Sequence, residues 1–276
     1  EHAAPQQINV FPKLGIRGDS LQCTEVDELA TASFISSGGN ADASATTYQG
    51  TARKFDLRRL AAKVEVSGDI AQNVSLVNDV FEQQIQAKML AIWKTVGTKV
   101  IYGDGVDPDP AGLQTLAAEN PAGELQPLAG ANTPLTLADL DNLVANQYPW
   151  DGGQPRAFVM NRGQYKRFAG LCHTAGFTPA FLPDPVLGVP LAHHMGVCIL
   201  VSDYITDTES TNRTSVYLVH LGPRQSEPQL GGLVWFYNQE TGAGIRVDGP
   251  HRTSEAADVL YADLEFNIGF ASLSSG

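Results

Sequence analysis

The feature that most constrains this chain is an apolar repeat that recurs every three or four positions over residues 74–100. The repeat consists of Val74, Val77, Phe81, Ile85, Met89, Ile92, Val96 and Val100. Such spacing places one apolar stripe along an α-helix. With Asn73 as N-cap and Gly103 as a stop, it predicts a helix over 74–101. That helix would be about 40 Å long, more than twice the usual length, which is typical of an extended molecule.

The chain ahead of this helix has few large apolar side chains. Residues 1–22 are interrupted by Pro and Gly, and we expect an arm that becomes ordered only along another surface. Residues 23–47 are rich in Ala, Ser, Thr and Gly, with a turn at 38–40, and residues 48–66 are expected to return as a strand. A long two-stranded hairpin is marginally stable in water, so its presence implies a partner surface.

Beyond the helix, the sequence predicts a connector and then a compact unit. Residues 103–135 are rich in Gly, Pro and Ala and form the connector. We expect helices at 137–147, capped by Thr136, and at about 163–171, and strands at 156–161, 197–203, 215–222, 231–238, 244–248 and 258–273. Short helices and strands in mixed order predict an α+β fold.

Composition argues against several classes of protein. Lys and Arg total 18 against 30 for Asp and Glu, and the net charge of -12 argues against a protein that grips nucleic acid by its phosphates. No apolar run is long enough to span a membrane, and no signal-peptide pattern opens the chain. The cysteines Cys23, Cys172 and Cys198 are widely spaced and odd in number, which argues against a disulfide framework and for a reducing compartment.

Two residue pairs are candidates for catalytic or metal chemistry. Cys172 and His173 could be a nucleophile and its base, but neighbours on a helix point apart, and a working pair needs hydrogen-bond contact. The candidate metal ligands are His193, His194, Cys172, Cys198 and Asp203. Zinc sites have ligand pairs at short, defined spacings, which these residues lack. The simpler interpretation is a buried cysteine at a helix end and two histidines in a loop.

The acidic sequence GDGVDPD at 103–109 has some features of a calcium-binding loop. It lacks the Gly required at the sixth position and the Glu at the twelfth, so a solvated acidic connector is expected instead. We therefore expect no catalytic residue, no cofactor and no metal site, and a protein that is not an enzyme. A cysteine-dependent or metal-dependent hydrolase is the alternative from another functional class.

Basic residues gather at 53–63, where five of the chain's 18 are found: Arg53, Lys54, Arg58, Arg59 and Lys63. Only Asp56 opposes them within this stretch. On so acidic a protein they could contact the acidic surface of an identical neighbour, and we take them as candidates for intersubunit contact. The alternatives are a solvated face of the hairpin, since single surface ion pairs contribute little, or a face turned toward DNA.

Several motifs occur in a characteristic order along most of the chain. IYGDG ends the long helix, AGLQTL lies in the connector, FVMNRGQYKRFAGL spans a strand and a helix, and LGVPL leads into VCILVSDYI. In motif order and spacing, the chain resembles the major capsid proteins of tailed double-stranded DNA phages, whose fold is shared with encapsulins and the herpesvirus capsid floor. The resemblance implies an N-terminal arm (1–22), an extended β-hairpin loop (23–63), a peripheral domain (64–130) with a spine helix (74–101), an axial domain (131–253), and a return strand of the peripheral domain (254–276).

The same resemblance implies a structural protein that self-assembles into the icosahedral head of a phage. Identical subunits would form pentamers and hexamers, with portal, scaffolding and decoration proteins as further partners and no membrane. Packaged double-stranded DNA would be enclosed without sequence-specific binding, in a virion assembled in the host cytoplasm. Glu1 in place of Met is consistent with N-terminal proteolytic maturation. An encapsulin-type nanocompartment shell is the alternative with the same fold.

Overall fold

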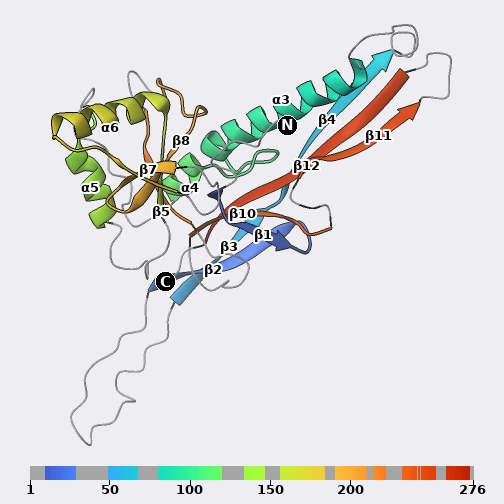
Figure 1. The fold of residues 1–276 in the computed structure, drawn as a ribbon. Helices are drawn as coiled ribbons and strands as arrows, with labels where there is room; N and C mark the ends of the chain where they lie inside the picture. The colour runs from blue at the N-terminus through green and yellow to red at the C-terminus, as the bar shows by residue number, and fades with distance from the viewer. Residues whose placement is uncertain are drawn as a thin grey trace, which may run out of the picture.

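The computed structural model describes residues 10–28, 49–67, 80–119, 134–146, 156–183, 190–209, 214–221, 232–240, 242, 244–252 and 259–273. Helices and strands occur in mixed order along these ranges, which confirms the expected α+β class. Figure 1 shows a compact part and a long, narrow part. No helix in the described ranges is long and apolar enough to cross a membrane.

The long part is built on helix α3 (Val80–Tyr102), which runs beside strands β4 (Arg58–Ser67) and β12 (Val259–Leu273), as Figure 1 shows. The buried residues of the helix are Ile92, Val96, Gly97, Val100 and Ile101. Ile92, Val96 and Val100 follow the predicted helical period, and with Ile101 they share one core with apolar residues of both strands.

The end of α3 agrees with the predicted stop. The helix finishes at Tyr102, and the Gly103 N–H donates to the Lys99 carbonyl at 2.9 Å. The first residues of the predicted helix, 74–79, and its predicted cap Asn73 lie outside the described residues.

Strand β12 is the centre of a five-stranded sheet. β4 pairs antiparallel with residues 259–268 of β12. β11 (Arg246–Arg252) pairs antiparallel with part of the same stretch, and β10 (Gly232–Asn238) pairs with the last residues of β12. β1 (Lys13–Ile16) adds to β10 in parallel. The strand predicted at 258–273 is thus confirmed.

This sheet crosses a predicted domain boundary. β10 and β11 lie within the unit expected to be 131–253, yet both pair with β12 in the C-terminal segment. A break at residue 253 would therefore separate strands that hydrogen-bond to one another. The boundary at 253 is implied by the resemblance, and strand pairing between segments distant in the sequence crosses it.

Part of the N-terminal arm is built into this core, contrary to the expectation that it orders only along another surface. Val10 and Phe11 are 6% and 1% exposed. The Pro12 carbonyl accepts a hydrogen bond from the backbone N–H of Trp235 at 2.9 Å. Residues 10–16 therefore bury their apolar surface within their own chain. The residues before Val10 lie outside the described ranges.

The hairpin is confirmed at its base, but its return strand is divided. β2 (Ser20–Glu28) and β3 (Gln49–Asp56) pair antiparallel as a two-stranded sheet. The prediction of one strand over 48–66 is wrong, because Leu57 separates β3 from β4 and the two strands join different sheets. The Leu57 N–H donates to the Asp19 carbonyl at 2.8 Å and closes the base of the hairpin. Its tip, with the predicted turn, lies outside the described residues.

The compact part is a second five-stranded sheet, in the order β6-β7-β8-β5-β9. Its strands are β5 (Arg156–Met160), β6 (Ala180–Pro183), β7 (Pro190–His194), β8 (Val197–Val201) and β9 (Tyr217–His220). β5, β8 and β9 were predicted, whereas β6 and β7 are short and bounded by Pro, which conceals them in the sequence. On β5, Phe158 and Met160 belong to one core and Ala157 and Val159 to the other. Cover on both faces explains why this strand is a continuous apolar run.

Helices α5 (Leu137–Asn146) and α6 (Arg162–Thr174) pack on one face of this sheet (Figure 1). Both were predicted. Thr136 and Asp139 form a reciprocal cap at the start of α5, in which the Asp139 N–H donates to the Thr136 hydroxyl at 3.3 Å and the Thr136 N–H donates to the Asp139 carboxylate at 2.8 Å. The side chain of Asn161 caps α6.

The pairing of β10 with β12 leaves no room for a side chain at one glycine of β12, Gly269. Gly269 lies opposite Phe236, and a Cβ there would come within 2.2 Å of the fully buried Phe236 ring. We expect Gly269→Ala to lower the free energy of unfolding by about 1–3 kcal/mol, because the ring has no room to move. Gly170 of α6 has open space at its Cβ position, so Gly170→Ala should raise that free energy by up to about 1 kcal/mol. Denaturant unfolding checks both variants, and equal losses in the two would contradict this account.

Candidate functional site at the base of the hairpin

The predicted contact residues lie on two consecutive strands, where the hairpin leaves the sheet of β12. Arg53 and Lys54 are on β3, and Arg58, Arg59 and Lys63 are on β4. β3 pairs with β2, whereas β4 pairs with β12. The five basic residues are therefore divided between two sheets. The side chain of Arg53 lies outside the described residues.

Lys54 and Lys63 each form an ion pair with an acid of their own strand. Lys54 Nζ lies 2.9 Å from Asp56 Oδ1, and Lys63 Nζ lies 2.6 Å from Glu65 Oε1. The hydrogen bond from Lys54 lowers the pKa of the Asp56 carboxyl below its usual value. The two lysine side chains are 64% and 51% exposed, and exposed pairs contribute little to folding. Both lysines are therefore accessible to a partner.

Arg58 is used within the chain. Its guanidinium donates to Asp107 Oδ1 at 2.7 Å and to the Gly105 carbonyl at 3.5 Å. Its side chain is only 19% exposed. Asp56 is the only acid within the basic stretch itself, and the fold adds a second acid, because it brings Asp107, 49 positions away in the sequence, against Arg58.

Lys99 of α3 forms an ion pair with another acid of the same loop, Asp109. The side chain of Asp109 is 26% exposed, whereas that of Asp107 is 82% exposed. The prediction of a solvated connector is therefore right for Asp107 and wrong for Asp109. Asp107, Pro108 and Asp109 together link strand β4 to helix α3, and we call these three residues the Asp-Pro-Asp bridge.

Backbone contacts hold the loop that carries the bridge. The Gly103 carbonyl accepts hydrogen bonds from the Gly112 N–H at 2.8 Å and from the Thr115 hydroxyl at 2.6 Å. A Cβ on Gly103 would lie 2.0 Å from the Pro110 carbonyl oxygen, so glycine is required there. Helix α4 (Leu113–Glu119) follows and packs into the core of α3. This helix was not predicted, because it is short and lies in a segment rich in Gly and Ala.

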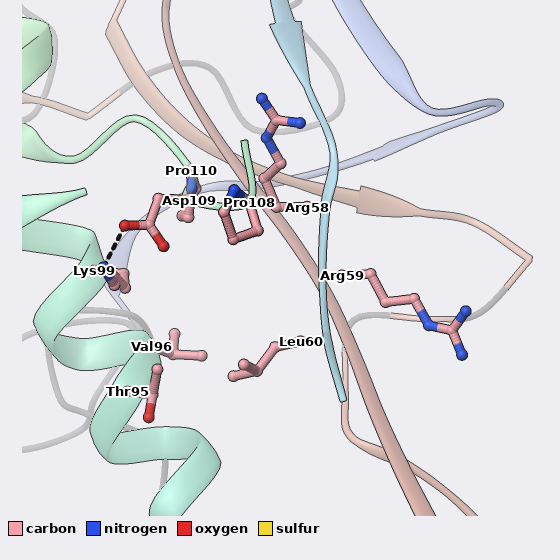
Figure 2. A pocket seen from close by; sticks show the side chains of 9 residues that line it. All are labelled: Arg58, Arg59, Leu60, Thr95, Val96, Lys99, Pro108, Asp109 and Pro110. Atoms are coloured by element: carbon pink, nitrogen blue, oxygen red, sulfur yellow. Dashed lines mark hydrogen bonds and ion pairs between the residues drawn. The ribbon is translucent and has the colours of Figure 1, made fainter. Parts of the chain in front are cut away.

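A pocket lies between β4, α3 and the bridge. It is a small hollow of about 90 Å³, partly open to solvent, and its lining includes Arg58, Leu60, Val96, Lys99, Pro108 and Asp109. In Figure 2, Leu60 and Val96 point toward each other across it, whereas the guanidinium of Arg59 points away from the helix.

Residues 8–222 match the model of the phage capsid family. This chain belongs to the phage capsid family. No curated protein sequence matches it.

Solved structures similar to this capsid protein include an encapsulin and two capsids. The encapsulin of the holo-SrpI complex from Synechococcus elongatus PCC 7942 is 17% identical, with a TM-score of 0.72 over 100% of this chain and 88% of that one. The capsid of a native GTA particle is 16% identical, with a TM-score of 0.64 over 98% of this chain and 86% of that one. The capsid of cyanophage A-1(L) is 13% identical, with a TM-score of 0.67 over 98% and 89%. These likenesses confirm the predicted fold, and family membership confirms the structural role of a major capsid protein.

Cys172, His193 and His194, candidates for catalysis or metal binding, make contacts within the fold of this capsid protein. Cys172 is fully buried on α6, where burial raises the pKa of its thiol. His193 Nδ1 hydrogen-bonds to the Leu191 carbonyl at 2.9 Å, and His194 Nε2 lies 2.7 Å from the Asp141 carboxylate of α5. Within the described ranges, no three His, Cys, Asp or Glu side chains come together as metal ligands.

The buried thiol tests the alternative in which Cys172 is a nucleophile. We expect Cys172 to resist iodoacetamide in the folded protein at mildly alkaline pH and to react in urea, because burial disfavours its thiolate. Mass spectrometry of the peptide that contains Cys172 measures the difference. Thr98→Cys, at an exposed position of α3, is the reactive control. Fast labelling of Cys172 in the folded state would support the hydrolase.

Proposed function

We propose that this capsid protein assembles with identical copies into an icosahedral shell, and that its role is mechanical and not enzymatic. The observation that carries the proposal is the sheet of β2 and β3, which among the described strands pair only with each other. Phe55 anchors the base of this hairpin in the core and is 8% exposed. A ribbon of two strands is nevertheless marginally stable in water. An identical neighbour would supply the surface that completes it.

Repetition makes weak contacts sufficient in such a shell, because each interface recurs around every symmetry axis. We propose that Arg53, Lys54, Arg59 and Lys63 meet the acidic surface of a neighbour, and the net charge of -12 supports this complementarity. In the proposed arrangement, α3 and the sheet of β12 form the peripheral domain. The compact sheet forms the axial domain, which meets its copies in pentamers and hexamers.

The proposed content of the shell is double-stranded phage DNA, enclosed without sequence-specific contacts. The net charge of -12 supports this, since an acidic wall does not adhere to phosphates. Portal, scaffolding and decoration proteins, N-terminal proteolytic maturation and assembly in the host cytoplasm complete the proposal. N-terminal sequencing of the protein from infected cells and from virions tests the maturation step, and identical starts in both would contradict it.

A protein nanocompartment is the second candidate, because the similar encapsulin matches over the whole of this chain. The two candidates differ in what the shell contains. Purified particles that protect double-stranded DNA from nuclease would support the phage head. Particles that contain a protein cargo and no DNA would support the nanocompartment.

Shell formation should depend on the hairpin tip, whereas folding should not. Glu28 and Gln49 are paired at the described end of the hairpin, so a two-residue Asn-Gly turn can replace residues 29–48. We expect this variant to unfold at the wild-type denaturant midpoint and to form no closed shells in electron micrographs, because it lacks surface that a neighbour would bury. Gly170→Ala, away from the hairpin, should form shells as the wild type does. Normal shells from the shortened hairpin would remove its proposed role.

A further inference from the structure

The Asp-Pro-Asp bridge joins the strand that continues from the hairpin to the long helix of the molecule. At one end Asp107 accepts a hydrogen bond from Arg58 of β4 at 2.7 Å. At the other end Asp109 pairs with Lys99 of α3. Figure 2 shows Pro108 between Asp109 and Arg58. Three consecutive residues thus connect two elements that carry opposite ends of the same pocket.

Arg58 lies at the junction between the hairpin and the sheet of β12, so the bridge holds the chain at the point where the hairpin begins. Arg58 is the first residue of β4, and only Leu57 separates it from β3 of the hairpin. Because β2 and β3 form a sheet of their own, no strand pairing among the described residues holds the hairpin at a set angle to β12. The hydrogen bond of Leu57 and the burial of Phe55 anchor the base of the hairpin. Arg58 restrains the chain at the junction itself.

We propose that Arg58 is a positioning residue for assembly: held by the Asp-Pro-Asp bridge, it sets the direction in which the hairpin leaves the subunit. That direction decides where the hairpin meets a neighbour, so the inference rests on the proposed shell-forming function. It replaces, for Arg58, the expected direct contact with a neighbour. With 19% of its side chain exposed, Arg58 offers a partner little surface.

A small change of angle at the junction becomes a large displacement at the far end of the hairpin. The 8 residues of β3 extend about 26 Å, at about 3.3 Å per residue. A rotation of about 10° at Leu57 would therefore move the far end of β3 by about 4 Å, which is enough to break van der Waals contact with a neighbour.

The ion pair is too weak to decide whether the subunit folds. Asp107 is 82% exposed, and a pair of this kind changes an equilibrium by a factor of about five at most. Its loss should leave the unfolding midpoint nearly unchanged. The same factor is sufficient to shift the balance between hairpin directions, and every copy in a shell repeats that shift.

The test compares variants of the full chain by two measurements. Arg58→Ala and Asp107→Ala each remove the pair, Arg58→Asp combined with Asp107→Arg re-forms it with the charges exchanged, and Asp109→Asn loosens the other end of the bridge. Amide hydrogen exchange of β3 is measured in free subunits, and shell closure is measured in electron micrographs. Arg162→Ala is the matched control, because it removes an exposed 3.0 Å ion pair with Asp203 in the compact part.

In each of the three single variants, Arg58→Ala, Asp107→Ala and Asp109→Asn, we expect the amides of β3 to exchange two- to fivefold faster than in the wild type. Each variant should also give fewer closed shells. The exchanged pair should return both measurements to wild-type values, and the control should change neither. Arg58→Lys should give more closed shells than Arg58→Ala but fewer than the wild type. The reason is that an ammonium group lacks the planar fork that reaches both Asp107 and Gly105.

Wild-type yields of closed shells from Arg58→Ala would overturn the proposal. Failure of the exchanged pair to restore the shells would also overturn it, because Arg58 would then contact a neighbour directly. Faster amide exchange throughout the chain, with no additional change in β3, would also contradict the proposal, because the bridge would then stabilise the fold without directing the hairpin. If the wild type itself formed no shells, the proposed function would fall, and exchange in free subunits would still decide whether the bridge restrains the hairpin.

Discussion

The pairing of β12 with strands from three other parts of the chain is the contact on which the rest of the structure depends. β4 lies along residues 259–268, β11 along part of the same stretch, and β10 along the end of the strand. Because β1 adds to β10, segments near the two ends of the chain meet in one sheet. The apolar stripe of helix α3 packs on this sheet. It shares a core with Val64 of β4 and Leu264 of β12, which are 1% and 0% exposed. Partners so distant in sequence close long loops when they pair, so this part of the subunit is complete only when its last strand is in place.

From this framework the subunit extends a hairpin that it stabilises only at the base. The basic residues around that base serve two purposes. Lys54 and Lys63 lie on the surface in weak local pairs, whereas Arg58 and Lys99 turn toward the acids of one loop. Exposed charges suit contact with an acidic neighbour, and the partly buried pairs suit the alignment of elements within one chain. A shell subunit needs both, because its contacts are weak singly and depend on a repeated geometry.

Two polar side chains elsewhere, His194 and Tyr102, join elements of the fold. His194 packs against the rings of Phe158 and Phe168 while it hydrogen-bonds to Asp141, and so ties β7 to α5. The Tyr102 hydroxyl donates to Glu209 at 2.6 Å, which ties the end of α3 to the compact part. Because β5 has one face toward each core, the two parts of the subunit pack as one body.

The sequence by itself determined the elements whose signal is local. The apolar stripe of α3, the cap of α5 and the buried run of β5 each depend on residues within a few positions, and the order of the motifs was enough to indicate the family. Only the tertiary structure decided the division of β3 from β4 at Leu57, the burial of the arm beside β10, and the pairing of Arg58 with Asp107. The physical reason is that helical period and capping are set by neighbours along the chain. Strand partners and ion pairs depend on which distant segments the fold brings within hydrogen-bond distance, and one local pattern is compatible with several such partners.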